Sequence, residues 1–188
     1  MIPYRAPGWL PGGHLQTVHP LLIRPDPLPY DRQRWETPDG DFIDLDWLAA
    51  PGGASAQHDA PPLLVVFHGL EGSSNSHYVL TLLAAAAAIG WAAVAVNFRG
   101  CSGESNRLPR AYHSGDSEEI DWILRRLRAA FPVRRHYAVG VSLGGNALLK
   151  WLGERGTTAS ACLHAAAAVS APVDLAACGH HLARGCNR

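Results

Sequence analysis

The chain has 188 residues, of which 47% are hydrophobic and 17% are charged, and its 16 basic side chains balance its 16 acidic ones. This length suffices for one domain with a hydrophobic core and is too short for two ordinary domains, and the composition excludes a disordered chain. Because nucleic acids and anionic membranes normally bind a basic face, zero net charge argues against either as the main partner.

The N-terminal residues contain no basic stretch followed by an apolar run, so we expect no secretory signal and a cytoplasmic protein. Residues 1–30 are rich in proline and glycine and predict an irregular lead-in. A β-hairpin is predicted next, since residues 32–37 and 42–48 flank a Pro-Asp-Gly turn. In its second strand, apolar side chains alternate with Asp44 and Asp46, which is the period of a half-exposed strand.

The apolar run 79–96 is long enough to suggest a transmembrane helix. Much of it is alanine, however, and alanine offers little apolar surface to lipid. Gly90 stands where a helix would end, and residues 91–96 follow it with the pattern of a short buried strand. We therefore expect a helix and then a strand, and no membrane span.

Continuous apolar runs predict strands buried on both faces, with helices between them. The strands are expected at 63–67, 91–97, 136–141 and 162–169, and the helices within 79–89, from Asp116 to Pro132, and over 143–152. At the start of the second helix, Asp116 is expected to cap the first turn while Glu119 reaches back. The alternation predicts an α/β fold, a mostly parallel sheet with helices on both faces.

The cysteines show neither Cys-x-x-Cys spacing nor a zinc pattern with histidine, which favours free thiols over disulfides or metal ligands. They are Cys101, Cys162, Cys178 and Cys186. We expect neither a metal nor a cofactor.

A candidate nucleophile lies between the strand 136–141 and the next helix, in the sequence Gly140-Val141-Ser142-Leu143-Gly144. This G-x-S-x-G pattern places a serine hydroxyl on a strained turn above the sheet, and its two glycines avoid collisions with the neighbouring strand and helix. We predict that Ser142 is a nucleophile; the alternative is a plain strand-to-helix turn.

Acyl transfer through a serine also needs donors for the developing oxyanion. The backbone N–H of Leu143 follows the nucleophile, and that of Leu70 lies in the turn after an earlier buried strand, so both are candidates. His68 could act as a general base, but a histidine that shapes the turn is the favoured interpretation. The Gly/Ser-rich stretch 69–76 could instead cradle phosphate, although it lacks the Gly-Lys-Ser/Thr ending of a P-loop.

Five motifs occur in one order and carry a family resemblance: residues 12–17 (GGHLQT), 68–73 (HGLEGS), 97–104 (NFRGCSGE), 112–116 (YHSGD) and 140–146 (GVSLGGN). Together they resemble the YheT-type (AB hydrolase 4) branch of the α/β-hydrolase superfamily, over residues 11 to about 175. The resemblance implies an α/β-hydrolase fold and a serine hydrolase acting on small-molecule carboxylic esters, with lipid or fatty-acyl esters as one class.

The resemblance makes Ser142 the nucleophile and Leu70 and Leu143 the oxyanion donors. It assigns no chemical step to residues 12–17 and 97–104, for which turn formation and helix capping are favoured.

The catalytic acid and base of this fold follow the nucleophile on later strands, yet only 44 residues follow Gly144. Asp174 is a candidate acid, with helix capping as the favoured alternative. His180 and His181 come without the strand that would bring an imidazole back to the serine. We therefore expect the C-terminal strands to be missing and the sheet edge beyond 162–169 to be unpaired.

The expected organisation is thus a lead-in over 1–30, a partial α/β-hydrolase domain over 31–176 and a tail over 177–188 that need not be ordered. Two functions remain open: a serine esterase with little activity as this chain alone, and a non-catalytic remnant that acts as a binding module. The oligomeric state is left open as well.

Overall fold

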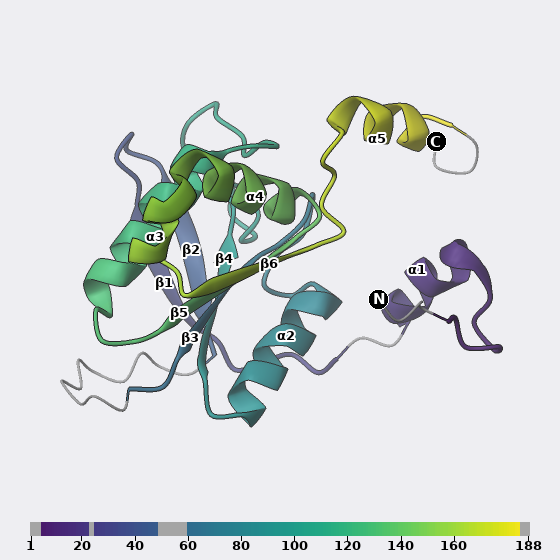
Figure 1. Cartoon of the computed structure of the whole chain (residues 1–188), viewed down its shortest axis with the longest axis horizontal. Helices are drawn as coiled ribbons and strands as arrows, with labels where there is room; N and C mark the ends of the chain where they lie inside the picture. The colour runs from purple at the N-terminus through teal and green to yellow at the C-terminus, as the bar shows by residue number, and fades with distance from the viewer. Residues whose placement is uncertain (1–4, 23–24, 49–59, 185–188) are drawn as a thin grey trace.

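The computed structural model describes residues 5–22, 25–48 and 60–184 and builds them around one six-stranded sheet. The strands are β1 (Asp31–Glu36), β2 (Phe42–Trp47), β3 (Leu63–Phe67), β4 (Ala92–Asn97), β5 (His136–Val141) and β6 (Ala165–Val169). Their order in the sheet is β1-β2-β4-β3-β5-β6 (Figure 1). β3, β4, β5 and β6 are parallel, whereas β1 and β2 form an antiparallel hairpin that joins the sheet at β4. The predicted mostly parallel α/β sheet with N-terminal hairpin strands is confirmed.

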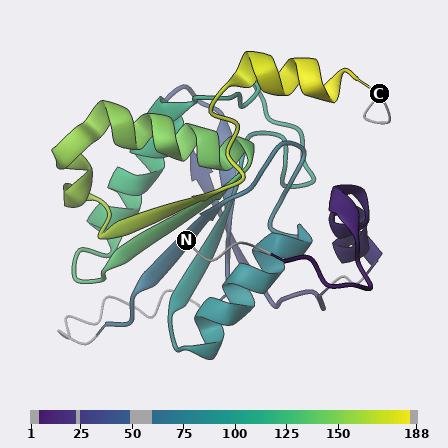
Figure 2. The ribbon, with the colours of Figure 1, turned by 45° about the vertical axis from the view of Figure 1, so that its right-hand side comes forward.

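Helices cover both faces of this sheet, as predicted (Figures 1 and 2). They are α1 (Gly12–Leu22), α2 (His77–Ala88), α3 (Ser117–Ala130), α4 (Leu143–Arg155) and α5 (Leu175–Leu182), with a short 3₁₀ helix at Gly156–Ala161. Alternate side chains of β3 supply the two cores: Leu63, Val65 and Phe67 pack with α3 and α4, whereas Leu64 and Val66 pack with α2. The run 79–96 is indeed a helix followed by a strand, and within the described ranges no helix is long and apolar enough to cross a bilayer.

The lead-in differs from the expectation of an irregular segment, because residues 12–22 form α1, which stands apart from the sheet (Figures 1 and 2). Local contacts hold this helix despite its glycines and an internal proline. The side chain of Thr17 donates to the Gly13 carbonyl at 2.8 Å, and the rings of Trp9 and His19 meet edge-on at 5.0 Å. Contacts between side chain and backbone of this kind are not visible in a pattern of apolar residues.

The second hairpin strand is not half exposed, as its alternation predicted, but buried along its whole length. Asp46 accepts two hydrogen bonds from Arg32, at 2.6 and 2.7 Å, and Asp44 accepts two from Arg34, at 2.8 and 2.9 Å. Both pairs sit directly opposite each other across β1 and β2. The arginines of the edge strand therefore shield carboxylates that would otherwise need solvent.

The last strand was expected to be buried, but all five residues of β6 are exposed. Within the described ranges β6 pairs with β5 alone and ends the sheet, so the prediction of an unpaired edge here is confirmed. Its alanines have the apolar composition of a central strand, but nothing among the described residues covers them.

The tail is helical rather than unordered over its described part, residues 177–184, since α5 runs to Leu182; residues 185–188 lie outside the described residues. Asp174 precedes this helix, and its carboxylate accepts a hydrogen bond from the Ala177 N–H at 2.8 Å. None of the α5 side chains is buried, so the cap and the backbone ladder hold the helix locally.

Candidate active site

Ser142 occupies the turn between β5 and α4 in a left-handed conformation, with φ 52° and ψ −117°. A serine rarely adopts this conformation, and its strain has to be held by the surroundings. Here the Ser142 N–H donates to the Val169 carbonyl of β6 at 2.9 Å, and the Ser142 carbonyl accepts from the Asn146 N–H at 2.9 Å. The backbone is thus anchored on both sides while the residue itself stays half-buried.

The two glycines of the pentapeptide lie where no β-carbon fits. A β-carbon on Gly140 would lie 2.6 Å from the Gly144 carbonyl oxygen. One on Gly144 would lie 2.6 Å from the Phe67 carbonyl oxygen and nearer still to that of His68. Strand β5, helix α4 and the end of β3 therefore approach one another at backbone distance beneath Ser142.

The turn after β3 passes directly beside the serine, because a β-carbon on Gly69 would lie 3.1 Å from the β-carbon of Ser142. The next residue along this turn is Leu70, and Leu143 opens the first turn of α4. Neither backbone N–H has an acceptor among the described residues. The structure thus brings together Ser142 and the segments that carry both candidate oxyanion donors.

His68 is fully engaged in shaping this turn. Its Nε2 accepts a hydrogen bond from the Phe98 N–H at 3.1 Å, so Nδ1 carries the proton and donates to the Gly69 carbonyl at 2.7 Å. Burial lowers the pKa of His68 to about 4, although the bond to Gly69 opposes this shift. With both ring nitrogens occupied, His68 has no lone pair with which to act as a general base.

The candidate acid and the late histidines lie elsewhere. Asp174 caps α5, and His180 and His181 are exposed on that helix, which stands beyond the C-terminal end of β6 (Figures 1 and 2). Across residues 5–22, 25–48 and 60–184, no side chain forms a hydrogen bond with the Ser142 hydroxyl. The same ranges hold no group of His, Cys, Asp and Glu side chains that could bind a metal ion.

The stretch 69–76 is poorly suited to cradle phosphate, because such a loop needs several free N–H groups. Seven of its eight backbone N–H groups already donate within the protein, and Leu70 carries the exception. Together with His77 and Tyr78, the stretch lines an open depression of about 420 Å³.

Two tyrosines contact this turn and were missed from the sequence. The hydroxyl of Tyr78, in the first turn of α2, accepts from the Gly69 N–H at 2.9 Å, and that of Tyr112 accepts from the Glu71 N–H at 2.7 Å. Tyr112 is the first residue of one of the five motifs, which marked it as a residue of interest. No spacing rule in the sequence, however, links it to Gly69 and Leu70.

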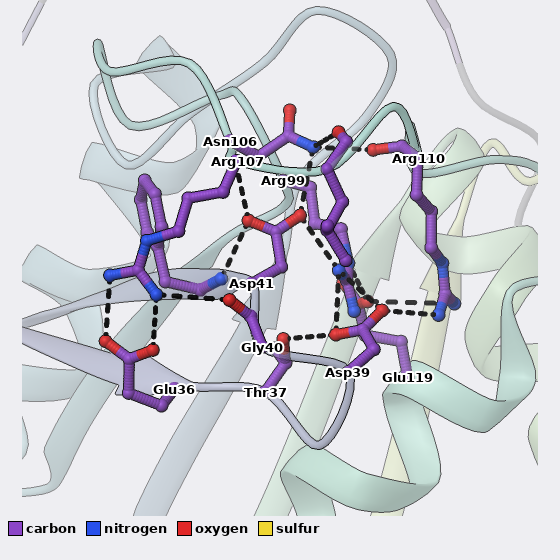
Figure 3. Close-up of polar contacts among 12 residues, drawn as sticks. Glu36, Thr37, Asp39, Gly40, Asp41, Arg99, Asn106, Arg107, Arg110 and Glu119 are labelled. Atoms are coloured by element: carbon purple, nitrogen blue, oxygen red, sulfur yellow. Dashed lines mark hydrogen bonds and ion pairs between the residues drawn. The ribbon is translucent and has the colours of Figure 1, made fainter.

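A buried ion network holds the loop 98–116 that carries Tyr112 (Figure 3). Arg99 is only 4% exposed and pairs with Asp39, Asp41 and Glu119 at 3.0, 3.0 and 2.7 Å. Burial raises the pKa of Glu119 above its usual value, and the ion pair with Arg99 offsets only part of this shift. The loop is therefore tied to the β1–β2 turn and to α3 by charge.

The same network overturns the predicted capping of α3. The carboxylate of Asp116 makes no capping bond and instead accepts from Arg110 at 3.1 Å, while Glu119 is engaged with Arg99. Two nearby arginines compete with the backbone N–H groups for these carboxylates, and charged donors bind more strongly.

Comparisons with known proteins agree with this geometry. A family model described as "alpha/beta hydrolase fold" matches residues 62–177. The chain is 50% identical over 177 residues to "Putative esterase YheT" of Escherichia coli (strain K12), covering 93% of this chain and 50% of that protein. It is 30% identical to "Phospholipase ABHD3" of Homo sapiens, covering 95% of this chain and 44% of that protein. The chain therefore spans about half the length of these relatives.

Solved structures show the same fold at low sequence identity. The esterase Pf2001 of Pyrococcus furiosus superimposes with a TM-score of 0.61 at 18% identity, covering 81% of this chain and 53% of that one. The serine hydrolase XC6422 of Xanthomonas campestris, described as lacking a lid, gives a TM-score of 0.59 at 20% identity, covering 80% and 66%.

Proposed function

Since this chain belongs to the alpha/beta hydrolase fold family, in its YheT-type branch, we propose that it supplies the nucleophile and the oxyanion donors of a serine hydrolase that cleaves carboxylic esters. The observation that carries this proposal is the left-handed turn at Ser142, flanked by the N–H groups of Leu70 and Leu143, which have no acceptor in the part of the chain that the structure describes. Strain at a serine between a strand and a helix is a feature of nucleophile elbows.

In the proposed reaction, Ser142 Oγ attacks the ester carbonyl carbon, and the oxyanion accepts hydrogen bonds from the Leu70 and Leu143 N–H groups. Breakage of the C–O bond releases the alcohol and leaves an acyl group on Ser142, which water then hydrolyses to the carboxylic acid. A base must remove the serine proton, and none of the described residues forms a hydrogen bond with the hydroxyl. We therefore predict little activity from this chain alone.

For the substrate, we propose small-molecule esters with an apolar acyl chain, including lipid or fatty-acyl esters. The Leu70 side chain is exposed and lines, with the polar residues that follow it in the turn, a depression of mixed apolar and polar character. The names of two relatives, an esterase and a phospholipase, support this class. A cytoplasmic location stays a prediction.

The second candidate function is a binding module without catalysis. The observation that favours it is the Ser142 hydroxyl itself, which lacks a hydrogen bond to any acid or base among the described residues. Asp174, the one candidate acid, is occupied as a helix cap.

A fluorophosphonate probe separates the two functions. We expect it to label the folded chain at Ser142, but slowly, because the candidate oxyanion donors are present while no described residue forms a hydrogen bond with the hydroxyl, and we expect Ser142→Ala to abolish labelling. Ser170→Ala is a matched control, because Ser170 also has a positive φ of 50° and also follows a parallel strand, but lies outside the pentapeptide. Absence of labelling in chain shown to be folded by circular dichroism would contradict the esterase and favour the binding module.

A further inference from the structure

Nearly all backbone N–H groups of the turn after β3 donate hydrogen bonds within the protein. Of the eight N–H groups from residue 69 to residue 76, that of Leu70 alone has no acceptor among the described residues. The N–H groups of residues 72, 73, 75 and 76 donate within the stretch, and that of Ser74 donates to the Asn97 side chain at 2.8 Å. The remaining two belong to Gly69 and Glu71, which flank Leu70.

Two tyrosine hydroxyls from distant elements take these flanking donors. Tyr78 from α2 accepts the Gly69 N–H, and Tyr112 from the loop before α3 accepts the Glu71 N–H, at 2.9 and 2.7 Å. The two acceptors therefore restrain the peptide groups on either side of the Leu70 N–H.

Each contact is tightly fitted. A β-carbon on Gly72 would lie 2.7 Å from the Tyr78 hydroxyl, so this hydroxyl fills a slot that glycine alone leaves open. Glu71 has a positive φ of 53°, a conformation that disfavours an ordinary side chain. The hydrogen bond from its N–H to Tyr112 offsets part of this strain.

Tyr112 is itself held in place. Its ring stacks on Phe98 with a centroid distance of 5.3 Å and an angle of 5° between the planes, and the His68 ring meets it edge-on at 6.1 Å. Burial raises the pKa of Tyr112 to about 12, so the hydroxyl remains a neutral phenol over the range in which the protein would work.

We propose that Tyr78 and Tyr112 are positioning residues that clamp the peptide groups on both sides of Leu70, so that its N–H remains the single unoccupied donor of the turn beside Ser142. The effect of this clamp on catalysis rests on the proposed function, whereas the clamp itself does not. Oxyanion donors must be held in place before the reaction, and small displacements of such groups cost large factors in rate.

The test uses the full 188-residue chain and three variants: Tyr78→Phe, Tyr112→Phe and, as a matched control, Tyr137→Phe. Tyr137 stacks on Trp91 at the start of β5, away from the turn. The first measurement is amide hydrogen exchange at single residues by NMR. We expect Tyr78→Phe to speed exchange at Gly69 and Tyr112→Phe to speed it at Glu71, by about tenfold, the loss expected for one neutral hydrogen bond. The Leu70 amide is expected to exchange readily in every form.

The second measurement follows the rate of fluorophosphonate labelling as the probe concentration is increased. It yields two quantities: the maximal labelling rate at saturating probe, and the probe concentration that gives half of this rate. We expect Tyr78→Phe and Tyr112→Phe each to lower the maximal labelling rate by roughly 10- to 100-fold. The probe concentration at half of the maximal rate should not change, because a displaced oxyanion donor stabilises the transition state less but leaves probe binding unaffected. Tyr137→Phe is expected to change neither quantity.

Unchanged exchange at Gly69 and Glu71, or a protected Leu70 amide in the wild-type chain, would overturn the clamp. Faster exchange with undiminished labelling would overturn its role in positioning. Absence of labelling in the wild-type chain would contradict the proposed function alone, since the exchange measurement decides on the clamp independently.

Discussion

At the level of single residues, the space around Gly144 is the sharpest constraint near the candidate nucleophile. A β-carbon there would overlap the backbone at the end of β3, which cannot move without disturbing the sheet. We expect Gly144→Ala to lower the free energy of unfolding by about 1–3 kcal/mol or more, the range typical of overpacking. Urea unfolding followed by circular dichroism measures this change.

Gly153 provides the matched control within the same helix. It is exposed, and a β-carbon there would meet nothing within 4 Å. Gly153→Ala is expected to raise the free energy of unfolding by about 0.5–1 kcal/mol, since alanine favours a helix interior. Similar losses in both variants would show that glycine at 144 is not required by packing.

His136, at the start of β5, is a buried histidine that the proposed chemistry does not use. Neither ring nitrogen makes a hydrogen bond of normal geometry among the described residues, although the Phe131 backbone favours the protonated ring and opposes part of the pKa shift. Burial, aided by the nearby positive charge of Arg128, lowers its pKa to about 4. As the pH falls, His136 is therefore protonated in the unfolded chain, near pH 6.5, before it is protonated in the folded chain, near pH 4. The neutral His136 thus contributes its full share to the free energy of unfolding above pH 6.5, and this share is lost as the pH falls toward 4.

We therefore expect His136→Leu to remove part of the fall in unfolding free energy between pH 6.5 and pH 4, on the order of 2 kcal/mol after allowance for solvent screening. Denaturant unfolding at a series of pH values measures it. Ala176→Leu, at an exposed and non-titrating position on α5, should leave the slope unchanged. An equal slope in wild type and His136→Leu would rule out His136 as its source.

At the level of elements, the charge network of Figure 3 joins the β1–β2 turn to the loop 98–116. Its centre is Asp41, which is fully buried and accepts from Arg99, from Asn106 and from the N–H groups of Phe42 and Arg107. Burial raises the pKa of Asp41, but these hydrogen bonds outweigh it and hold the pKa well below its usual range.

Replacing the Asp41 carboxylate with a neutral amide removes one of the negative charges that balance the buried positive charge of Arg99. We expect Asp41→Asn to cost about 3–5 kcal/mol in the free energy of unfolding and to loosen the loop that carries Tyr112. Urea unfolding tests the first effect and amide exchange across residues 98–116 tests the second. Asp31→Asn, on the exposed side of β1, is the control and should change neither quantity measurably.

At the level of the whole molecule, the two edges of the sheet differ. β1 carries charged side chains, whereas β6 is a run of exposed alanines and one valine without charge or proline. Edges of the second kind pair readily with other strands. We expect association that increases with protein concentration, and expect Ala167→Lys to reduce it by severalfold in sedimentation velocity.

Ala161→Lys adds the same charge at an exposed position before β6 and serves as the control. If both variants reduce association equally, net charge is responsible and not the strand edge. If neither does, the association involves another surface.

The order of strands and helices was largely predictable, because buried strands and amphipathic helices leave periodic traces in the sequence. The turn at Ser142 was predictable for a related reason: the strand, the glycines and the helix lie within a few consecutive residues. The burial of Asp44 and Asp46 was not, since it depends on arginines of a neighbouring strand. The displaced capping of α3 by Asp116 likewise depends on Arg110 and Arg99, which reach the helix only in the folded chain.

By itself, the sequence determined the α/β class, the positions of most elements and the serine turn, because local periodicity and backbone sterics act over a few residues. Only the tertiary structure decided that His68 has no free nitrogen, that β6 is an exposed edge and that, among the described residues, the Leu70 N–H alone in its turn has no acceptor. These properties arise from hydrogen bonds and packing between segments far apart in the chain, and no local pattern of residues encodes them.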